Sequence, residues 1–135
     1  MIVIDASSLA KYVLKEDGWV EIEKYLIQEE VRSIDHVLKE TLNAIWKCTI
    51  ALGSFPLDVA DEKYAVLMKL IGEVIRVEDE GEYLKDAFRI ALHEGITIYD
   101  SLYIAQAMKH KAKLLTSDKG QAKVAQSLGL KVILL

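Results

Sequence analysis

Short apolar runs along this chain alternate with longer segments in which apolar residues recur every three or four positions. The short runs are typical of buried strands, and the predicted strands cover residues 2–4, 31–34, 74–77, 113–116 and 132–135. The longer segments are typical of helices, and the predicted helices cover residues 9–14, 19–28, 36–52, 56–72, 83–94, 100–109 and 119–128. This alternation of strands and helices predicts an α/β fold with a central, mostly parallel sheet covered on both faces.

Small polar residues and glycines predict where several helices begin and end. Ser7 and Ser8 are good N-caps for the helix that follows the first strand, and Asp35 is predicted to cap the helix at 36–52. Gly53 is predicted to end that helix. Residues 96–99 form a further apolar run, so Asp100 is predicted to open the next helix.

The composition fits one folded unit. The chain has 135 residues, of which 52% are hydrophobic and 28% charged, which is enough to bury one full core. This composition excludes a disordered tail and a collagen-like repeat, and a lone Cys48 excludes a disulfide framework. No repeat and no Gly/Ser-rich or Pro-rich linker interrupts the pattern, so we expect a single domain over residues 1–135.

The same pattern bears on the compartment. No window approaches the roughly 18 uninterrupted apolar residues of a membrane span, so we expect no membrane association. The first five residues carry no basic segment ahead of an apolar stretch, as a secretion signal would. With a single cysteine, the expected compartment is a reducing cytoplasm.

Charge is distributed unevenly along the chain. Residues 1–100 carry 11 Lys and Arg against 20 Asp and Glu, a balance of −9, whereas residues 101–135 carry six Lys against Asp118 alone, a balance of +5. An acidic chain is a poor candidate for nonspecific duplex binding, which needs many phosphate contacts. The basic end is therefore either a local contact for a polyanion or a set of solvated helix faces.

Four carboxylates stand out by their positions. Asp5 and Asp118 each follow a predicted strand, and Asp100 follows the apolar run at 96–99. Ligands of parallel α/β sheets bind where strands end and helices begin, so these three side chains are expected to converge at one edge. Glu40 lies one turn into the helix after the second strand, on the face of Asn43 and Lys47, from which it can reach the same edge.

Each acid taken alone also has a structural explanation. Asp5 and Asp100 are ordinary turn or cap residues, Asp118 fits an Asx turn, and Glu40 fits a solvated helix face. As a set, however, converging carboxylates repel one another and are costly without a cation between them. Oxygen ligands without His or Cys favour Mg²⁺ or Mn²⁺ over zinc or copper.

Four short motifs contain these acids: Val3-Ile4-Asp5-Ala6-Ser7, Lys39-Glu40-Thr41-Leu42-Asn43-Ala44, Tyr99-Asp100-Ser101-Leu102-Tyr103-Ile104-Ala105 and Leu115-Thr116-Ser117-Asp118. Together, in this order and at these intervals, they resemble the four motifs of PIN domains, and more narrowly those of the VapC toxins of type II toxin–antitoxin systems. The resemblance covers essentially the whole chain. Ser8 departs from it, because family members often have an apolar residue there.

The resemblance implies a PIN-like, RNase-H-like three-layer α/β/α sandwich and a Mg²⁺- or Mn²⁺-dependent endoribonuclease that is inhibited by a small VapB-type antitoxin. Carried over by position, the catalytic and metal-binding acids are Asp5, Glu40, Asp100 and Asp118. Ser7 and Thr116 would orient carboxylates or water, and Asn43 would support the site or the packing of its helix.

The sequence allows two interpretations of the role of several further residues. Lys11, Lys47, Lys119 and Lys123 flank the predicted edge and either hold RNA phosphates or are solvated. Tyr99 and Tyr103 either stack an unpaired base or pack at the rim of the core. The middle helices carry apolar residues that suggest a homodimer, although core packing explains many of them as well: Trp46, Phe55, Leu57, Val66 and Leu70. The three histidines and Cys48 lie outside the acidic motifs, so no nucleophilic triad is predicted.

Two classes of function remain at this point. One is the metal-dependent ribonuclease, and the other is a non-catalytic or regulatory module that binds Mg²⁺ or RNA. A receiver domain would pair acids after the first strand, where this chain has only Asp5, and a haloacid-dehalogenase-type phosphatase would need Asp in place of Ser7. The presence of all four acids favours the enzyme.

Overall fold

The sheet at the centre of the computed structural model, which describes residues 1–135, has five strands that are all parallel. The order of the strands across the sheet is β3-β2-β1-β4-β5. Their bounds lie within one residue of the predicted ones: β1 (Ile2–Ile4), β2 (Val31–Ile34), β3 (Ile75–Glu78), β4 (Lys113–Thr116) and β5 (Val132–Leu134). The predicted α/β/α class with a mostly parallel sheet is confirmed.

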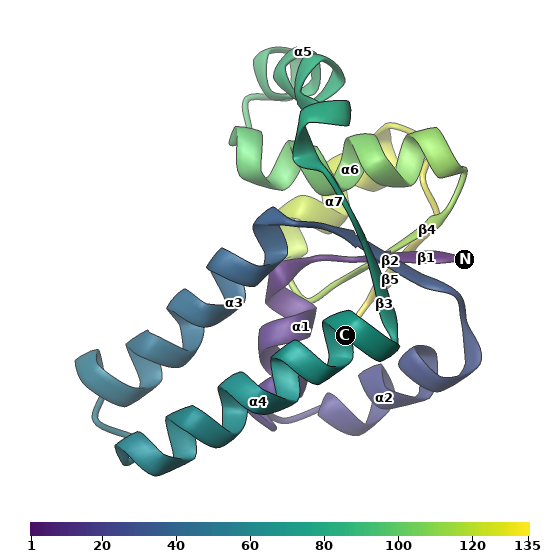
Figure 1. The fold of residues 1–135 in the computed structure, drawn as a ribbon. Helices are drawn as coiled ribbons and strands as arrows, with labels where there is room; N and C mark the ends of the chain where they lie inside the picture. Colours follow the sequence, from purple (N-terminus) through teal and green to yellow (C-terminus); the bar gives the residue numbers. More distant parts are fainter.

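Helices cover both faces of this sheet (Figure 1). The helices are α1 (Ala6–Val13), α2 (Trp19–Gln28), α3 (His36–Trp46), α4 (Leu57–Glu73), α5 (Leu84–Glu94), α6 (Ile98–His110) and α7 (Lys119–Ser127). The first four lie on one side of the sheet, with α3 and α4 projecting side by side as a two-helix arm, and the last three lie on the other side. None of these helices combines the length and the apolar character that a membrane crossing requires.

The winding of the chain places a switch point between β1 and β4. The chain first runs outward from β1 through β2 to β3, then returns to β4 beside β1 and continues to β5. At such a switch point the connections on the two sides diverge and leave a crevice at the carboxyl ends of the strands, which is where α/β folds bind ligands. β1 itself is buried on both faces, since Ile2, Val3 and Ile4 have no exposed surface.

Two predicted helix starts are wrong. Asp5, rather than Ser7 or Ser8, is the N-cap of α1, because its carboxylate accepts a hydrogen bond from the Ser8 backbone N–H at 3.0 Å. Residues 96–99 do not precede the helix as a run of their own, since α6 begins at Ile98 with Thr97 as its N-cap. Asp100 thus lies in the first turn of α6, where its backbone N–H donates to the Thr97 hydroxyl at 3.2 Å.

The helix predicted from 36 to 52 begins at His36 as expected, but its cap and its C-terminal end differ from the prediction. Asp35 has helical backbone angles and makes no capping bond, because its carboxylate accepts instead from the Glu80 backbone N–H, in the turn η2 (Glu80–Glu82). α3 ends at Trp46 and continues as a π-helical turn, η1 (Lys47–Ala51). The buried Thr49 hydroxyl donates to the Ile45 carbonyl at 2.8 Å in this region. Gly53 follows with a positive φ of 62°, as a glycine after a helix commonly has.

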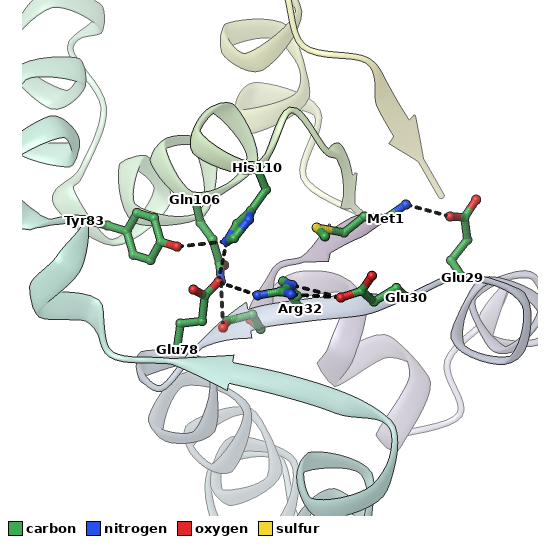
Figure 2. A network of polar contacts seen from close by, with 9 residues as sticks. Met1, Glu29, Glu30, Arg32, Glu78, Tyr83, Gln106 and His110 are labelled. Carbon is green, nitrogen blue, oxygen red and sulfur yellow. Dashed lines mark hydrogen bonds and ion pairs between the residues drawn. The ribbon is translucent and has the colours of Figure 1, made fainter.

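A partly buried polar network ties α6 and the start of α5 to the sheet (Figure 2). Glu78, at the end of β3, is its hub: one carboxylate oxygen contacts His110 Nε2 at 2.7 Å and accepts from Gln106 Nε2 at 2.9 Å. Arg32 of β2 lies 3.7 Å from the same oxygen, and the Tyr83 hydroxyl contacts His110 Nε2 at 3.1 Å. Burial would raise the pKa of Glu78, but the hydrogen bonds from Gln106, His110 and Tyr83 outweigh burial and lower it.

This network predicts how acid affects stability. A carboxyl whose pKa is lowered in the folded state adds stability while it is ionised and loses that contribution as the pH falls and it takes up a proton. Glu78→Gln should therefore cost about 1 to 3 kcal/mol of unfolding free energy at about pH 7 and clearly less at about pH 4. Urea denaturation at the two pH values measures this difference.

The matched control is Glu30→Gln, which removes the exposed partner of the same arginine. Exposed ion pairs contribute about 0 to 1 kcal/mol, so this variant should stay close to the wild type at both pH values. Equal losses in the two variants would contradict the role assigned to Glu78.

Candidate active site

A cavity of about 250 Å³ opens at the carboxyl edge of the sheet, next to the ends of β1 and β4. Its walls come from α1, α3, α6 and α7, and all four sequence-predicted acids line it. The ten lining residues are Asp5, Ala6, Ser7, Ala10, Glu40, Ala44, Asp100, Tyr103, Asp118 and Gln121. The structure thus brings together carboxylates that lie far apart in the sequence.

Asp5 is the most deeply buried of the four acids, with 1% of its surface exposed. The Ser7 hydroxyl contacts both of its carboxylate oxygens, at 2.8 and 2.9 Å, and the Thr116 hydroxyl donates to one of them at 2.5 Å. Burial raises the pKa of Asp5 to about 6, although hydrogen bonds from Thr116, Ser8 and Ser7 oppose the increase. Hydrogen bonds from Ser7 and Thr116 thus hold this carboxylate in place.

Asp118 is the exposed member of the set. It is the N-cap of α7, and its carboxylate accepts from the Gln121 backbone N–H at 3.0 Å. Its own backbone N–H donates to the Thr116 hydroxyl at 3.0 Å, so Thr116 connects Asp118 with Asp5. One carboxylate oxygen of Asp118 remains free of hydrogen bonds to the protein.

Asp100 is half-buried and lies near the negative charges of two other acids of the cavity. Burial raises its pKa most, and the negative charges of Asp118 and Glu40 raise it further. The buried Gln121 side chain donates to the backbone carbonyl of Asp100 at 3.0 Å and so links the start of α6 to α7. This contact fixes the backbone that carries the Asp100 carboxylate.

Glu40 is held by an aromatic side chain across the cavity. The buried Tyr103 hydroxyl donates to Glu40 Oε1 at 2.7 Å, and His36 Nε2 lies 3.4 Å from the same oxygen. Burial and the neighbouring Glu40 carboxylate raise the pKa of Tyr103 far above its usual value, so its hydroxyl stays protonated and remains a donor. Glu40 Oε2 is left free.

The donor set suits a divalent cation such as Mg²⁺ or Mn²⁺. The cavity offers four carboxylates and no His or Cys, which is the ligand chemistry that these ions prefer. A cation would also offset the repulsion that raises the pKa of Asp100. In the present side-chain arrangement no three His, Cys, Asp or Glu groups lie close enough to share one ion. The residues therefore fit a cation by type and location, while only Asp5 has both carboxylate oxygens engaged by hydrogen bonds from the protein.

The other candidate residues lie outside the cavity lining. Asn43 is exposed, as are Lys47 in η1 and Lys119 and Lys123 on α7. Lys11 is partly buried, and its ammonium group donates to the Leu135 carbonyl at 2.9 Å. Of these lysines, only the two on α7 belong to the helix that Asp118 caps.

The sequence pattern did not predict three residues that hold the acids. Gln121 stands three positions after the cap Asp118, which is the spacing of a capping box and could have identified it. His36 precedes Glu40 by one helical turn, a spacing that brings side chains together. No local pattern predicts the contact of Tyr103 with Glu40, which joins residues 63 positions apart.

Comparisons of the sequence with known proteins point to one family. The family model of the PIN domain matches residues 2–127. The chain is 34% identical over 119 residues to Ribonuclease VapC3 from Pyrobaculum aerophilum, an alignment that covers 87% of this chain and 89% of that protein.

Solved structures share the fold at lower identity. PAE2754 from Pyrobaculum aerophilum superposes with a TM-score of 0.72 at 22% identity over 97% of this chain and 82% of that one. VapBC2 from Rickettsia felis, bound to a promoter DNA fragment, gives 0.67 at 15% identity over 100% and 99% of the two chains. FitAcB from Neisseria gonorrhoeae gives 0.59 at 19% identity over 98% and 96%. With a family model that spans nearly its full length and a close relative of similar size, this chain belongs to the PIN domain family.

Proposed function

We propose that this protein is a Mg²⁺- or Mn²⁺-dependent endoribonuclease and the toxin of a VapBC-type toxin–antitoxin pair. The observation that carries the proposal is the gathering of Asp5, Glu40, Asp100 and Asp118 in one cavity at the switch point of the sheet. The similarity to a ribonuclease of the VapC group supports the same reaction.

The chemistry addresses the negative charge of the phosphodiester, which repels a nucleophile. A divalent ion held by the four acids would supply positive charge to the phosphate and make an attacking water more acidic. Ser7 and Thr116 hold the Asp5 carboxylate, and Tyr103 holds Glu40 so that its second oxygen is free. Asp100, whose pKa is raised, is suited to accept the proton of the water.

The charged groups of α7 suit the RNA backbone. Lys119 and Lys123 are exposed on the helix that begins at Asp118, so they can contact phosphates next to the cavity. Lys47 lies farther along the arm, and Lys11 is engaged with a carbonyl oxygen. We therefore assign substrate contacts to Lys119 and Lys123 ahead of Lys11 and Lys47.

One observation favours the second candidate, a module that binds Mg²⁺ or RNA without hydrolysis. No three of the acids are close enough to share an ion in the present arrangement. Mg²⁺ bound by only one or two carboxylates keeps several waters and needs phosphate oxygens of the substrate to complete its coordination. Cleavage of RNA in the presence of the metal separates this candidate from the enzyme.

A protein partner forms part of the proposal. VapBC2 and FitAcB, by their names, are complexes whose nuclease-like chains share this fold. We infer that a small VapB-type antitoxin binds this chain and inhibits it in the cytoplasm.

We also propose a homodimer that forms through the two-helix arm. The exposed large apolar side chains of the arm include Trp46 of α3 and Leu57 and Val66 of α4. Monomeric proteins rarely leave a large apolar patch exposed to water. Phe55 and Leu70 instead pack partly against the core, so the core explains these two. The exposed members of this set form the proposed contact.

Removing either of two acids tests the enzyme. Asp5→Asn and Asp100→Asn should each lower the rate of RNA cleavage in Mg²⁺ or Mn²⁺ by about 100-fold or more, because the cation loses a charged ligand. Gel assays on mixed RNA substrates, with metal and with chelator, measure this rate. The control is Asp86→Asn on α5, an exposed acid outside the cavity, which should cleave like the wild type. Undiminished cleavage by either site variant, or cleavage in chelator, contradicts the proposal.

The buried Asp5 also predicts a cost in the metal-free protein. Its pKa is raised from 3.8 to about 6, so its contribution to stability is present below about pH 4 and is lost as the pH rises through about 6. Above that pH the cost of ionising it amounts to about 3 kcal/mol. Asp5→Asn keeps the capping oxygen and removes the charge, so in chelator it should be more stable than the wild type at about pH 8 and similar to it at about pH 4.

Thermal and urea denaturation of the two proteins measure this difference, and Mn²⁺ provides the complementary comparison. Added Mn²⁺ should stabilise the wild type and have a much smaller effect on Asp5→Asn, because a ligand stabilises only the state that binds it. If Asp5→Asn were less stable than the wild type at about pH 8 in chelator, the negative charge of Asp5 would not lower the free energy of unfolding, and the prediction would be wrong.

The proposed homodimer contact through the two-helix arm predicts that a substitution there halves the molecular mass in solution. Leu57→Glu should convert a dimer into a monomer with unchanged secondary structure, because it places a charge in an apolar contact. The control is Ile27→Glu on α2, which alters an equally exposed apolar residue away from the arm. Sedimentation velocity distinguishes the two outcomes, and a wild type that is monomeric at micromolar concentration contradicts the homodimer.

A further inference from the structure

Two layers of contacts join α3 to α6 beside the acidic cavity. In the inner layer, the Tyr103 hydroxyl donates to Glu40. One helical turn toward the start of each helix stand His36 and Tyr99, which form the outer layer. Their rings are stacked, with centroids 4.9 Å apart and planes inclined by 15°. Each residue of the outer layer is next to an acid of the cavity. His36 contacts Glu40, and Asp100 directly follows Tyr99 in the sequence.

The two aromatic residues of the outer layer differ in exposure. Tyr99 is 56% exposed, whereas the side chain of His36 is 15% exposed. His36 is placed between two carboxylates, with Nε2 at 3.4 Å from Glu40 and Nδ1 at 3.7 Å from Glu80. The Tyr99 ring therefore rests on a histidine that is itself held in place, and it presents its uncovered surface to solvent next to the cavity.

We propose that Tyr99 is a stacking platform for one unpaired base of the RNA, beside the phosphate that enters the cavity. This inference rests on the proposed function and adds a binding site to it. Proteins that bind single strands stack bases on exposed aromatic rings, which every base can use because each has a π-face. Tyr103 cannot serve in this way, because it is 1% exposed and bonded to Glu40.

The negative charges around Tyr99 favour binding of a base over binding of a phosphate group. Glu40 and Glu80 flank the supporting histidine, and Asp100 follows Tyr99, so a phosphate group is repelled from this position. An uncharged base is not repelled, and its amino groups can donate to carboxylates. The RNA backbone would pass on the side of Lys119 and Lys123, with one base turned toward α3 and α6.

Binding measurements on two probes test the platform. The probes are a dodecamer of adenylate RNA and a dodecamer of the same ribose-phosphate backbone without bases, each labelled at one end. Asp5→Asn serves as the background so that the adenylate probe stays intact, and fluorescence anisotropy in Mg²⁺ gives the Kd. In this background Tyr99→Leu should weaken binding of the adenylate probe by about tenfold, since one stacked base contributes of that order.

Four comparisons make this result specific. Tyr99→Phe keeps an aromatic ring and should bind the adenylate probe within about twofold of the background protein. Tyr64→Leu removes a similarly exposed tyrosine from α4 and should have no effect. The backbone probe should bind all four proteins equally, and in the otherwise wild-type chain Tyr99→Leu should raise KM for RNA cleavage more than it lowers kcat.

The opposite outcomes overturn the platform. They are equal binding of adenylate RNA by Tyr99→Leu and its background, equal weakening with both probes, or a loss in Tyr99→Phe as large as in Tyr99→Leu. A loss of antitoxin binding with unchanged RNA binding would assign Tyr99 to a protein contact instead. These outcomes are independent of the proposed function, because a wild type that cleaves RNA while Tyr99→Leu binds normally refutes only the platform. A wild type that binds the adenylate probe through Tyr99 without cleaving RNA refutes only the nuclease.

Discussion

The parallel pairing of β1 with β4 is the constraint on which the site depends. It places Asp5 beside Thr116, which lies 111 residues later and whose hydroxyl donates to the Asp5 carboxylate. The Asp5 backbone N–H donates to the carbonyl of Leu115, the residue before Thr116, at 3.2 Å. Because both strands end at the same level, the helices that follow them start from one edge. The carboxylates of α3 and α6 then need only one turn of helix each to reach that edge.

Two acids of the candidate site also serve the fold, as the structural interpretation of the sequence predicts. Asp5 caps α1 and Asp118 caps α7, so each satisfies a backbone donor that would otherwise lack a partner. The structural interpretation is therefore correct for these two residues, and it is compatible with the functional role proposed for them. The arrangement still costs stability, because burial of Asp5 and the mutual repulsion around Asp100 raise their pKa values. Such costs are typical of functional sites.

The sequence predicts the elements well and the contacts between them poorly, for physical reasons. Strands and helices follow from local hydrophobic periodicity, so their bounds were mostly correct. The starts of α1 and α6 were wrong because several neighbouring polar residues compete for each cap, and backbone angles set by packing decide between them. Asp35 precedes α3 as predicted but makes no capping bond, because its carboxylate accepts from the distant Glu80 backbone N–H. The four acids could be identified from their motifs. Their partners could not all be identified, because Tyr103 meets Glu40 only through the packing of α6 beside α3.

The same pair of helices carries both layers of contacts, and this would couple the proposed RNA binding to the acids of the cavity. His36 touches Glu40 on one side and stacks on Tyr99 on the other, so a shift of this ring would move both the platform and a carboxylate of the cavity. Residues in one such network do not contribute independently, and substitutions at His36, Tyr99 and Tyr103 should show non-additive effects. A base seated on Tyr99 would also cover His36 and lower the exposure of the Glu40 side of the cavity to water. Since charges interact more strongly where water is excluded, RNA binding itself would then strengthen the hold of the acids on a cation.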